Sequence, residues 1–174
     1  MAWPLLPRQV EDLEVRRATA SDLSAVSTVL VEAAFWLEEK GIPLWDLGSL
    51  SESQIKPQVL NGEFWLFFRE SELAGVVKFQ LEDLIYWPDS IAGEAAYVHK
   101  LVVRRAYAGE GVSTRILEWA AKRAGELKRS HLRLDCEVSR DRLRRIYEDF
   151  GFARVGDIDL DGRIMARFQL DISK

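Results

Sequence analysis

Hydrophobic positions follow two different periods along the chain, and each period predicts a different kind of element. Short runs that alternate in polarity, or that are rich in β-branched and aromatic side chains, are typical of β-strands. The most strand-like run is residues 95–103, whose composition suits a central position in a sheet. Such runs predict strands at residues 12–18, 64–69, 73–81, 95–103, 131–137, 152–156 and 163–170.

Apolar residues that recur every three or four positions predict the helices. Four such stretches cover residues 23–40, 51–60, 111–128 and 140–150. Gly41 and Gly151 follow the first and the last of them, where glycine commonly ends a helix. The order of the elements predicts one mixed α/β domain over residues 1–174, with a ligand site at the carboxyl end of a central strand.

Composition narrows the class of protein. The 174 residues are 48% hydrophobic and 30% charged, with a net charge of −4. This is an ordinary globular composition, and the lack of a basic stripe argues against a nucleic-acid partner. No apolar run approaches a membrane span and the start lacks a signal-peptide pattern, so we expect no membrane partner and a cytoplasmic location. The single cysteine, Cys136, lies between two acidic residues and is expected to be structural.

The segment between residues 104 and 113 has the pattern of an anion site. It follows the strongest strand and leads into a helix, whose first N–H groups point outward and favour negative charge. Gly109 and Gly111 would let the backbone approach a phosphate, and Arg104 and Arg105 flank the loop. The spacing is neither that of a P-loop nor that of a Rossmann fingerprint, and the bare pattern also fits a simple turn.

Three motifs together resemble the GNAT superfamily of acyl-CoA-dependent N-acetyltransferases, and the resemblance covers nearly the whole chain. Residues 99–113 (HKLVVRRAYAGEGVS) are similar to the family's strand and Q/R-x-x-G-x-G/A loop, with Gly111 on the first signature glycine. Residues 146–152 (IYEDFGF) are similar to its Y-E-x-x-G-F ending, and residues 16–22 (RRATASD) to its opening R-x-A-x-x-x-D. The resemblance implies a mixed, mostly antiparallel central sheet with helices on both faces, splayed at the central strand.

The resemblance also implies that acetyl-CoA is the acyl donor and that no metal takes part. The backbone of Leu101 and Val103 would bind the pantetheine arm, and the following loop would bind the pyrophosphate. The implied donor contacts are Leu101, Val103, Ala108, Gly109, Glu110, Gly111, Val112, Ser113 and Arg140. Three of them depart from the family pattern, because Ala108 replaces Gln or Arg, Ser113 replaces Gly or Ala, and Arg140 stands where Asn is usual.

Tyr147 and His99 are the candidate catalytic residues. A tyrosine at the position of Tyr147 often acts as the general acid in the family that the chain resembles, and a phenol is protonated at neutral pH. Packing of Tyr147 against the core is the other interpretation. His99 is the candidate base because neutral imidazole accepts a proton at physiological pH, with Glu94 or a chain of waters as alternatives. Strict alternation along the strand would put His99 and Leu101 on the same face.

Aromatic residues and carboxylates gather in the segments expected to form the acceptor site. Trp36, Trp45 and Trp87 are the candidate substrate contacts, because aromatic walls beside carboxylates suit a cationic amine. Core packing or dimer contacts are equally good interpretations of these tryptophans, and a homodimer is left open. We therefore expect acetylation of a small cationic amine. A protein N-terminal or lysine acetyltransferase and a non-catalytic acyl-CoA-binding module are the alternatives.

Overall fold

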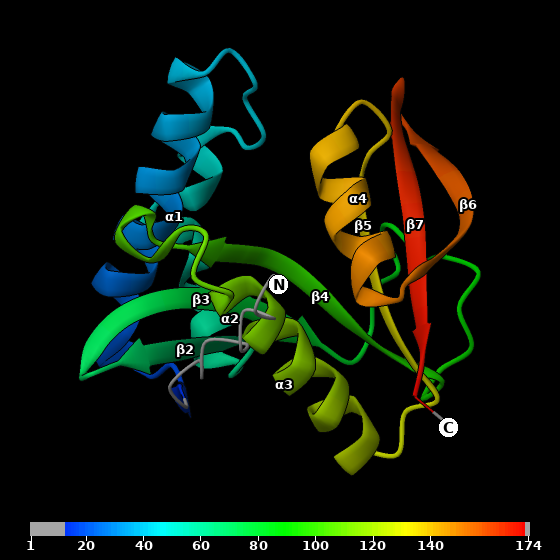
Figure 1. Cartoon of the computed structure of the whole chain (residues 1–174), viewed down its shortest axis with the longest axis horizontal. Helices are drawn as coiled ribbons and strands as arrows, with labels where there is room; N and C mark the ends of the chain where they lie inside the picture. Colours follow the sequence, from blue (N-terminus) through cyan, green and yellow to red (C-terminus); the bar gives the residue numbers. More distant parts are fainter. Residues whose placement is uncertain (1–12, 173–174) are drawn as a thin grey trace, which may run out of the picture.

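Seven strands form one sheet in the computed structural model, which describes residues 13–172 (Figure 1). Their order across the sheet is β1-β2-β3-β4-β5-β7-β6, and every neighbouring pair is antiparallel except β4 and β5. The strands are β1 (Glu14–Arg17), β2 (Phe64–Arg69), β3 (Glu72–Gln80), β4 (Ala95–Val103), β5 (His131–Glu137), β6 (Ala153–Leu160) and β7 (Arg163–Asp171). The mixed, mostly antiparallel sheet is thus confirmed. Asp12, the first residue of the first predicted strand, lies outside the described residues.

Helices cover both faces of this sheet, as predicted. The helices α1 (Leu23–Glu39) and α2 (Glu52–Leu60) bury Val26, Leu30 and Ile55 against one face. The helices α3 (Val112–Glu126) and α4 (Asp141–Phe150) pack on the other face. Alternation along the strands supplies each helix pair with its own apolar surface, so the sheet separates two hydrophobic cores.

The first long helix corrects the expectation that no segment is long and apolar enough to span a membrane. Residues Ala20–Glu39, with a mean hydropathy of 1.3, are long and apolar enough to cross a membrane by length and composition alone. In the structure, however, α1 packs against the sheet and α2, and the Ser27 hydroxyl donates a hydrogen bond of 2.8 Å to the Leu50 carbonyl. Its apolar character is therefore explained by its contribution to the core.

A β-bulge interrupts β4 at Lys100. Val102 pairs with Val76 and His99 pairs with Lys78, so Lys100 and Leu101 together face the single residue Val77. Lys100 takes the left-handed conformation that such an insertion requires, with φ of +47°. The predicted strict alternation is therefore wrong beyond His99, because the extra residue moves Leu101 to the face of α3.

The sheet splays open between β4 and β5. These parallel strands pair only from Ala95 to Tyr97, opposite His131 to Arg133. Beyond Tyr97, β5 continues along β7 while β4 continues along β3, so the two strands separate (Figure 1). The predicted splay at the central strand is confirmed, and it leaves the β5-facing edge of β4 without a strand partner.

Strand β6 is longer than predicted. The sequence favoured an end at Gly156, but the strand continues to Leu160. The register of β6 against β7 shifts between Arg154 and Gly156, and this bulge accommodates the glycine, whose φ is +150°. Glycine inside a strand commonly marks such a bulge, and here it does not end the strand.

Candidate active site

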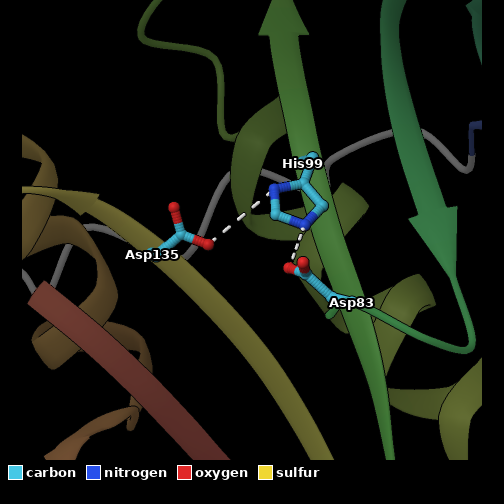
Figure 2. A group of neighbouring side chains, drawn as sticks. All are labelled: Asp83, His99 and Asp135. Atoms are coloured by element: carbon cyan, nitrogen blue, oxygen red, sulfur yellow. Dashed lines mark hydrogen bonds and ion pairs between the residues drawn. The ribbon is translucent and has the colours of Figure 1, made fainter. Parts of the chain in front are cut away.

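His99 lies at the splay with a carboxylate on each side of its ring (Figure 2). Its Nε2 is 2.8 Å from Oδ2 of Asp83, and its Nδ1 is 3.8 Å from Oδ2 of Asp135. The side chains of both aspartates are 4% exposed and that of His99 is 16% exposed. Three residues far apart in sequence therefore form one largely buried polar cluster.

Asp83 is held in place by the loop between β3 and β4. Its Oδ1 accepts backbone hydrogen bonds from Ile85, at 3.2 Å, and from Tyr86, at 3.0 Å. This is the local turn that aspartate commonly stabilises, and it directs Oδ2 toward His99. The Tyr86 ring lies beside the imidazole, with 5.4 Å between ring centroids. Burial would raise the pKa of Asp83, but the hydrogen bond and the charge of His99, together with the backbone hydrogen bonds from Tyr86 and Ile85, lower that pKa overall.

Asp135 comes from β5, on the opposite side of the splay. Alternation along β5 directs Leu134 and Cys136 into the core beneath α3 and α4, so Asp135 faces the other way, toward His99. Burial raises the pKa of Asp135 to about 6, and His99 offsets part of that rise. Within the described residues, the buried Oδ2 of Asp135 has no hydrogen-bond partner.

Tyr147 is partly buried and lies in the C-terminal half of α4. Its ring contacts Phe152 and Phe168, at centroid distances of 6.1 Å and 5.7 Å. Burial raises the pKa of Tyr147 above its usual range, and the neighbouring Cys136 and Asp135 add to that rise. The phenol is therefore protonated throughout the neutral range and can donate a proton or a hydrogen bond.

Cys136 faces the same core and is 3% exposed. Burial raises the pKa of its thiol to about 12, so the nucleophilic thiolate form is disfavoured. This environment supports the structural role expected from the sequence.

The loop after β4 presents backbone groups at the start of α3. Gly109 and Gly111 both take left-handed conformations, with φ of +78° and +79°. A Cβ on Gly109 would meet no atom within 4 Å, and Ala108, Gly109 and Glu110 are all exposed. The first turn of α3 leaves the N–H groups of Val112 and Ser113 without acceptors inside the helix. An anion can approach this backbone closely, so the loop fits a pyrophosphate.

The side chains around this loop are engaged with the body of the protein. Arg104 pairs with Glu32 of α1 at 3.5 Å, and the Arg105 guanidinium lies 4.0 Å from the ring centroid of Trp36. Glu110 forms an ion pair with Arg69 of β2. These contacts fasten the loop to α1 and β2, so the anion site is built mainly from backbone.

Leu101 and Val103 lie on β4 beyond the bulge and pack against the core beneath α3. Val103 pairs with Gly75 of β3, while the other edge of the strand faces the splay. The backbone of both residues thus lies along the edge of β4 that has no strand partner.

Arg140 does not occupy the role that the sequence predicted for it. Its guanidinium donates to the backbone carbonyl of Ile42, at 2.7 Å, and to that of Pro43. Its Nε lies 3.7 Å from the carboxylate of Glu137. Because both terminal nitrogens of the guanidinium are engaged in this way, Arg140 bridges the α1–α2 connection to the start of α4.

The three candidate tryptophans lie in three different environments. Trp45 is partly buried beside the Lys100 ammonium, 5.6 Å from its ring centroid, and so borders the bulge. The Trp36 ring packs against the guanidinium of Arg105, at the start of the loop after β4. Trp87 is only 4% exposed, and the guanidinium carbons of Arg133 and Arg167 are each 4.8 Å from its ring centroid. The structure contradicts direct contact of Trp87 with a substrate, because so little of its side chain is accessible.

Glu94, the alternative base, is held away from the splay. It pairs with Arg133 at 3.0 Å and lies 3.6 Å from His131, at the beginning of β4 and β5. The strands are still paired there, whereas His99 lies where they separate. The structure thus brings His99, and not Glu94, together with the open edge of β4.

Comparison with known proteins agrees with this geometry. The model of the acetyltransferase (GNAT) family matches residues 31–152. YesJ of Bacillus subtilis, an uncharacterized N-acetyltransferase, is 30% identical over 145 residues, which are 80% of this chain and 81% of YesJ. A GNAT-family acetyltransferase from Listeria monocytogenes is 27% identical, with a TM-score of 0.74 over 91% of this chain and 95% of that one. A Salmonella typhimurium protein assigned as an acetyltransferase, solved with its cofactor acetyl-CoA, is 14% identical, with a TM-score of 0.70 over 94% and 96% of the two chains.

Proposed function

Because the chain belongs to the GNAT acetyltransferase family and is thereby an acyltransferase, we propose that it moves the acetyl group of acetyl-CoA to the primary amine of a small cationic metabolite. The observation that carries this proposal is the buried cluster of Asp83, His99 and Asp135 beside the open edge of β4. Two buried carboxylates next to an imidazole suit a cationic amine that must lose a proton before it reacts.

The donor site consists of the loop after β4 and the strand edge before it. The backbone of residues 108–113 would hold the pyrophosphate, since its two left-handed glycines keep side chains out of the way. The backbone of Leu101 and Val103 would hold the pantetheine arm along the splay. Acetyl-CoA supplies an activated acyl group there, and no metal is needed for a direct transfer.

The reaction needs one group that accepts a proton and one that donates a proton. The amine nitrogen bonds to the carbonyl carbon of the thioester while the carbon–sulfur bond breaks. His99 takes the proton that the ammonium group gives up before it reacts. The nitrogen loses a second proton once it has bonded to the carbonyl carbon, and that proton replaces the one that Tyr147 supplies to the departing thiolate. The two residues come from β4 and α4, on opposite sides of the splay.

A small acceptor is favoured over an extended peptide by the bridge that Arg140 makes. This side chain connects residues 42 and 43 to the start of α4 across the splay. Such a bridge narrows the space in which an acceptor can bind. The aromatic side chains of Trp45, beside Lys100, and of Tyr86, beside His99, border this space.

A matched pair of acceptors tests the proposed substrate class. We expect 1,4-diaminobutane to be acetylated with a kcat/KM at least about 10-fold higher than that of 4-aminobutanoate. The reason is that Asp83 and Asp135 repel the carboxylate of 4-aminobutanoate. Thiol release from acetyl-CoA measures both rates at the same pH. Equal rates, or a preference for the aminobutanoate, would contradict an acceptor site selective for cations.

Replacing Tyr147 with phenylalanine tests the proposed acid. We expect kcat to fall by about 100-fold, toward the lower end of what a general acid contributes, while the Kd of acetyl-CoA stays the same. Tyr107→Phe is the matched control, since Tyr107 is also partly buried against the same core. If the two variants retain the same kcat as the parent, Tyr147 has only a packing role.

A further inference from the structure

The two ring nitrogens of His99 face two different carboxylates (Figure 2). The 2.8 Å contact between Nε2 and Asp83 is a hydrogen bond, and an ionised carboxylate can only accept. Nε2 must therefore carry a proton. In the neutral ring Nδ1 is then a free acceptor, and it points across the splay toward Asp135.

Asp135 is a buried carboxylate that no lysine or arginine between residues 13 and 172 neutralises. The nearby cationic side chains are already paired with other carboxylates: Arg167 with Asp89, Arg163 with Glu137, and Lys78 with Glu63. Oδ2 of Asp135 consequently has no hydrogen-bond partner among the described residues. The one described side chain near it that can become cationic is His99, whose Nδ1 is 3.8 Å away. A buried polar atom of this kind needs a partner, and a ligand can supply it.

We propose that Asp135 binds the ammonium group of the acceptor and that Asp83 is a positioning residue that fixes the tautomer of His99, so that Nδ1 takes the ammonium proton. This inference rests on the function proposed above, because it assigns roles within the same acceptor site. The gap of 3.8 Å between Oδ2 and Nδ1 allows one nitrogen atom to reach both at once.

The proton balance of this step is simple. The ammonium group donates one hydrogen bond to Oδ2 of Asp135 and one to Nδ1 of His99. The latter proton moves to Nδ1, which leaves a neutral amine with a free lone pair and a cationic imidazolium. Asp83 and Asp135 then stabilise the imidazolium from both sides, and solvent takes the proton after the product leaves.

The same three residues could also be considered as metal ligands, because their ligand atoms lie within 4.8 Å of one another. Nε2 and Nδ1 lie on different sides of the imidazole ring, however, and Nε2 is already hydrogen-bonded to Asp83. An ion at Nδ1 would gain only His99 and Asp135 from the cluster, fewer than the three or four protein ligands of a typical zinc site. The geometry favours proton transfer, and metal binding becomes an outcome of the test.

The electrostatic surroundings predict the direction of the pH dependence. The groups that face Asp135 and His99 are Lys78 on β3, Asp83 and Tyr86 on the β3–β4 loop, Glu137 on β5, and Arg163 and Arg167 on β7. The pKa of Asp135 is raised to about 6 by burial, so this carboxylate is ionised above that pH and protonated below it. Because only the ionised form attracts the positive charge of an ammonium group, kcat/KM for the amine should fall as the pH drops through 6.

Histidine NMR on the full-length chain tests the assignment without any substrate. The sequence contains only two histidines, so His99 is assigned by comparison with a His131→Gln variant. Long-range ¹H–¹⁵N spectra should show the neutral His99 ring protonated at Nε2. Asp83→Asn should raise the share of the Nδ1-protonated tautomer, because Nε2 then loses its charged acceptor. Asp161→Asn, which removes an exposed carboxylate in the turn between β6 and β7, should leave the tautomer unchanged.

An activity readout then separates binding from positioning. With 1,4-diaminobutane as the probe, Asp135→Asn should raise KM at least about 10-fold, while Asp83→Asn should lower kcat. An Nδ1-protonated ring in the parent, or a tautomer that does not change in Asp83→Asn, would overturn the proposal even if the enzyme acetylates amines. Micromolar binding of Zn²⁺ that shifts the His99 signals would overturn it in favour of a metal site.

Discussion

Acetyl-CoA binding is expected to weaken by at least about 100-fold when Gly111 is replaced with aspartate. Gly111 precedes the first turn of α3, where free N–H groups point toward the expected position of the pyrophosphate. A carboxylate at this point would face two phosphate groups, and the juxtaposition of like charges costs several kcal/mol. Calorimetric titration of parent and variant with acetyl-CoA measures the loss directly.

Two further variants separate charge from backbone strain in this experiment. Gly162→Asp introduces the same side chain at a similar left-handed position, with φ of +86°, in the turn between β6 and β7. A Cβ there meets no atom within 4 Å, so acetyl-CoA binding should not change. Gly111→Ala should cost less than Gly111→Asp, since it adds strain without charge. Equal acetyl-CoA affinity in Gly111→Asp and the parent would remove the donor assignment from this loop.

Replacing His99 with glutamine is expected to lower kcat by about 100-fold or more at pH 7. The amide can still hydrogen-bond to Asp83, but it cannot accept the proton of an ammonium group. The loss should shrink as the pH rises toward the pKa of a free alkylamine, near 10, because the acceptor then arrives already deprotonated. Steady-state kcat measured from pH 6 to pH 10 in both proteins gives this profile.

The other histidine and the alternative base provide the controls for His99. His131→Gln changes a residue that lies 3.6 Å from Glu94 at the paired beginning of the strands, so kcat should be retained. Glu94→Gln should likewise leave the pH profile unchanged. A large loss in Glu94→Gln together with a small loss in His99→Gln would transfer the role of base to Glu94.

The element order could be read from the sequence because local patterns determine it. The apolar period of α1, the β-branched run of β4 and the glycine after α4 each act over a few residues. The conformation of the loop after β4 was predictable for the same reason, since two glycines between a strand and a helix form a short local pattern. Here the structure adds the left-handed φ values and the contacts that hold the loop in place.

The acceptor site was harder to predict because it depends on contacts between distant segments. Nothing near Lys100 in the sequence signals the bulge that moves Leu101 to the other face of β4. Trp87 is buried because Arg133 and Arg167 come to it from β5 and β7. The guanidinium of Arg140 donates hydrogen bonds to the carbonyl groups of residues 42 and 43, almost 100 residues earlier in the chain.

Asp135 is the functional candidate that sequence reasoning missed. The sequence marked it only as an acidic neighbour of Cys136, although the alternation of β5 already put it on the opposite face from Leu134 and Cys136. A carboxylate facing away from the core on a strand beside the splay was a usable signal. Its pairing with His99 could not be derived, because it depends on the parallel register of β4 and β5.

Calorimetric titration of the unmodified protein with acetyl-CoA is the decisive experiment for the proposed donor site. One molecule of acetyl-CoA should bind per chain with a micromolar Kd, held by the loop after β4 and the open strand edge. No binding at millimolar acetyl-CoA would contradict the donor site, and with it the proposed acetylation of an amine at His99.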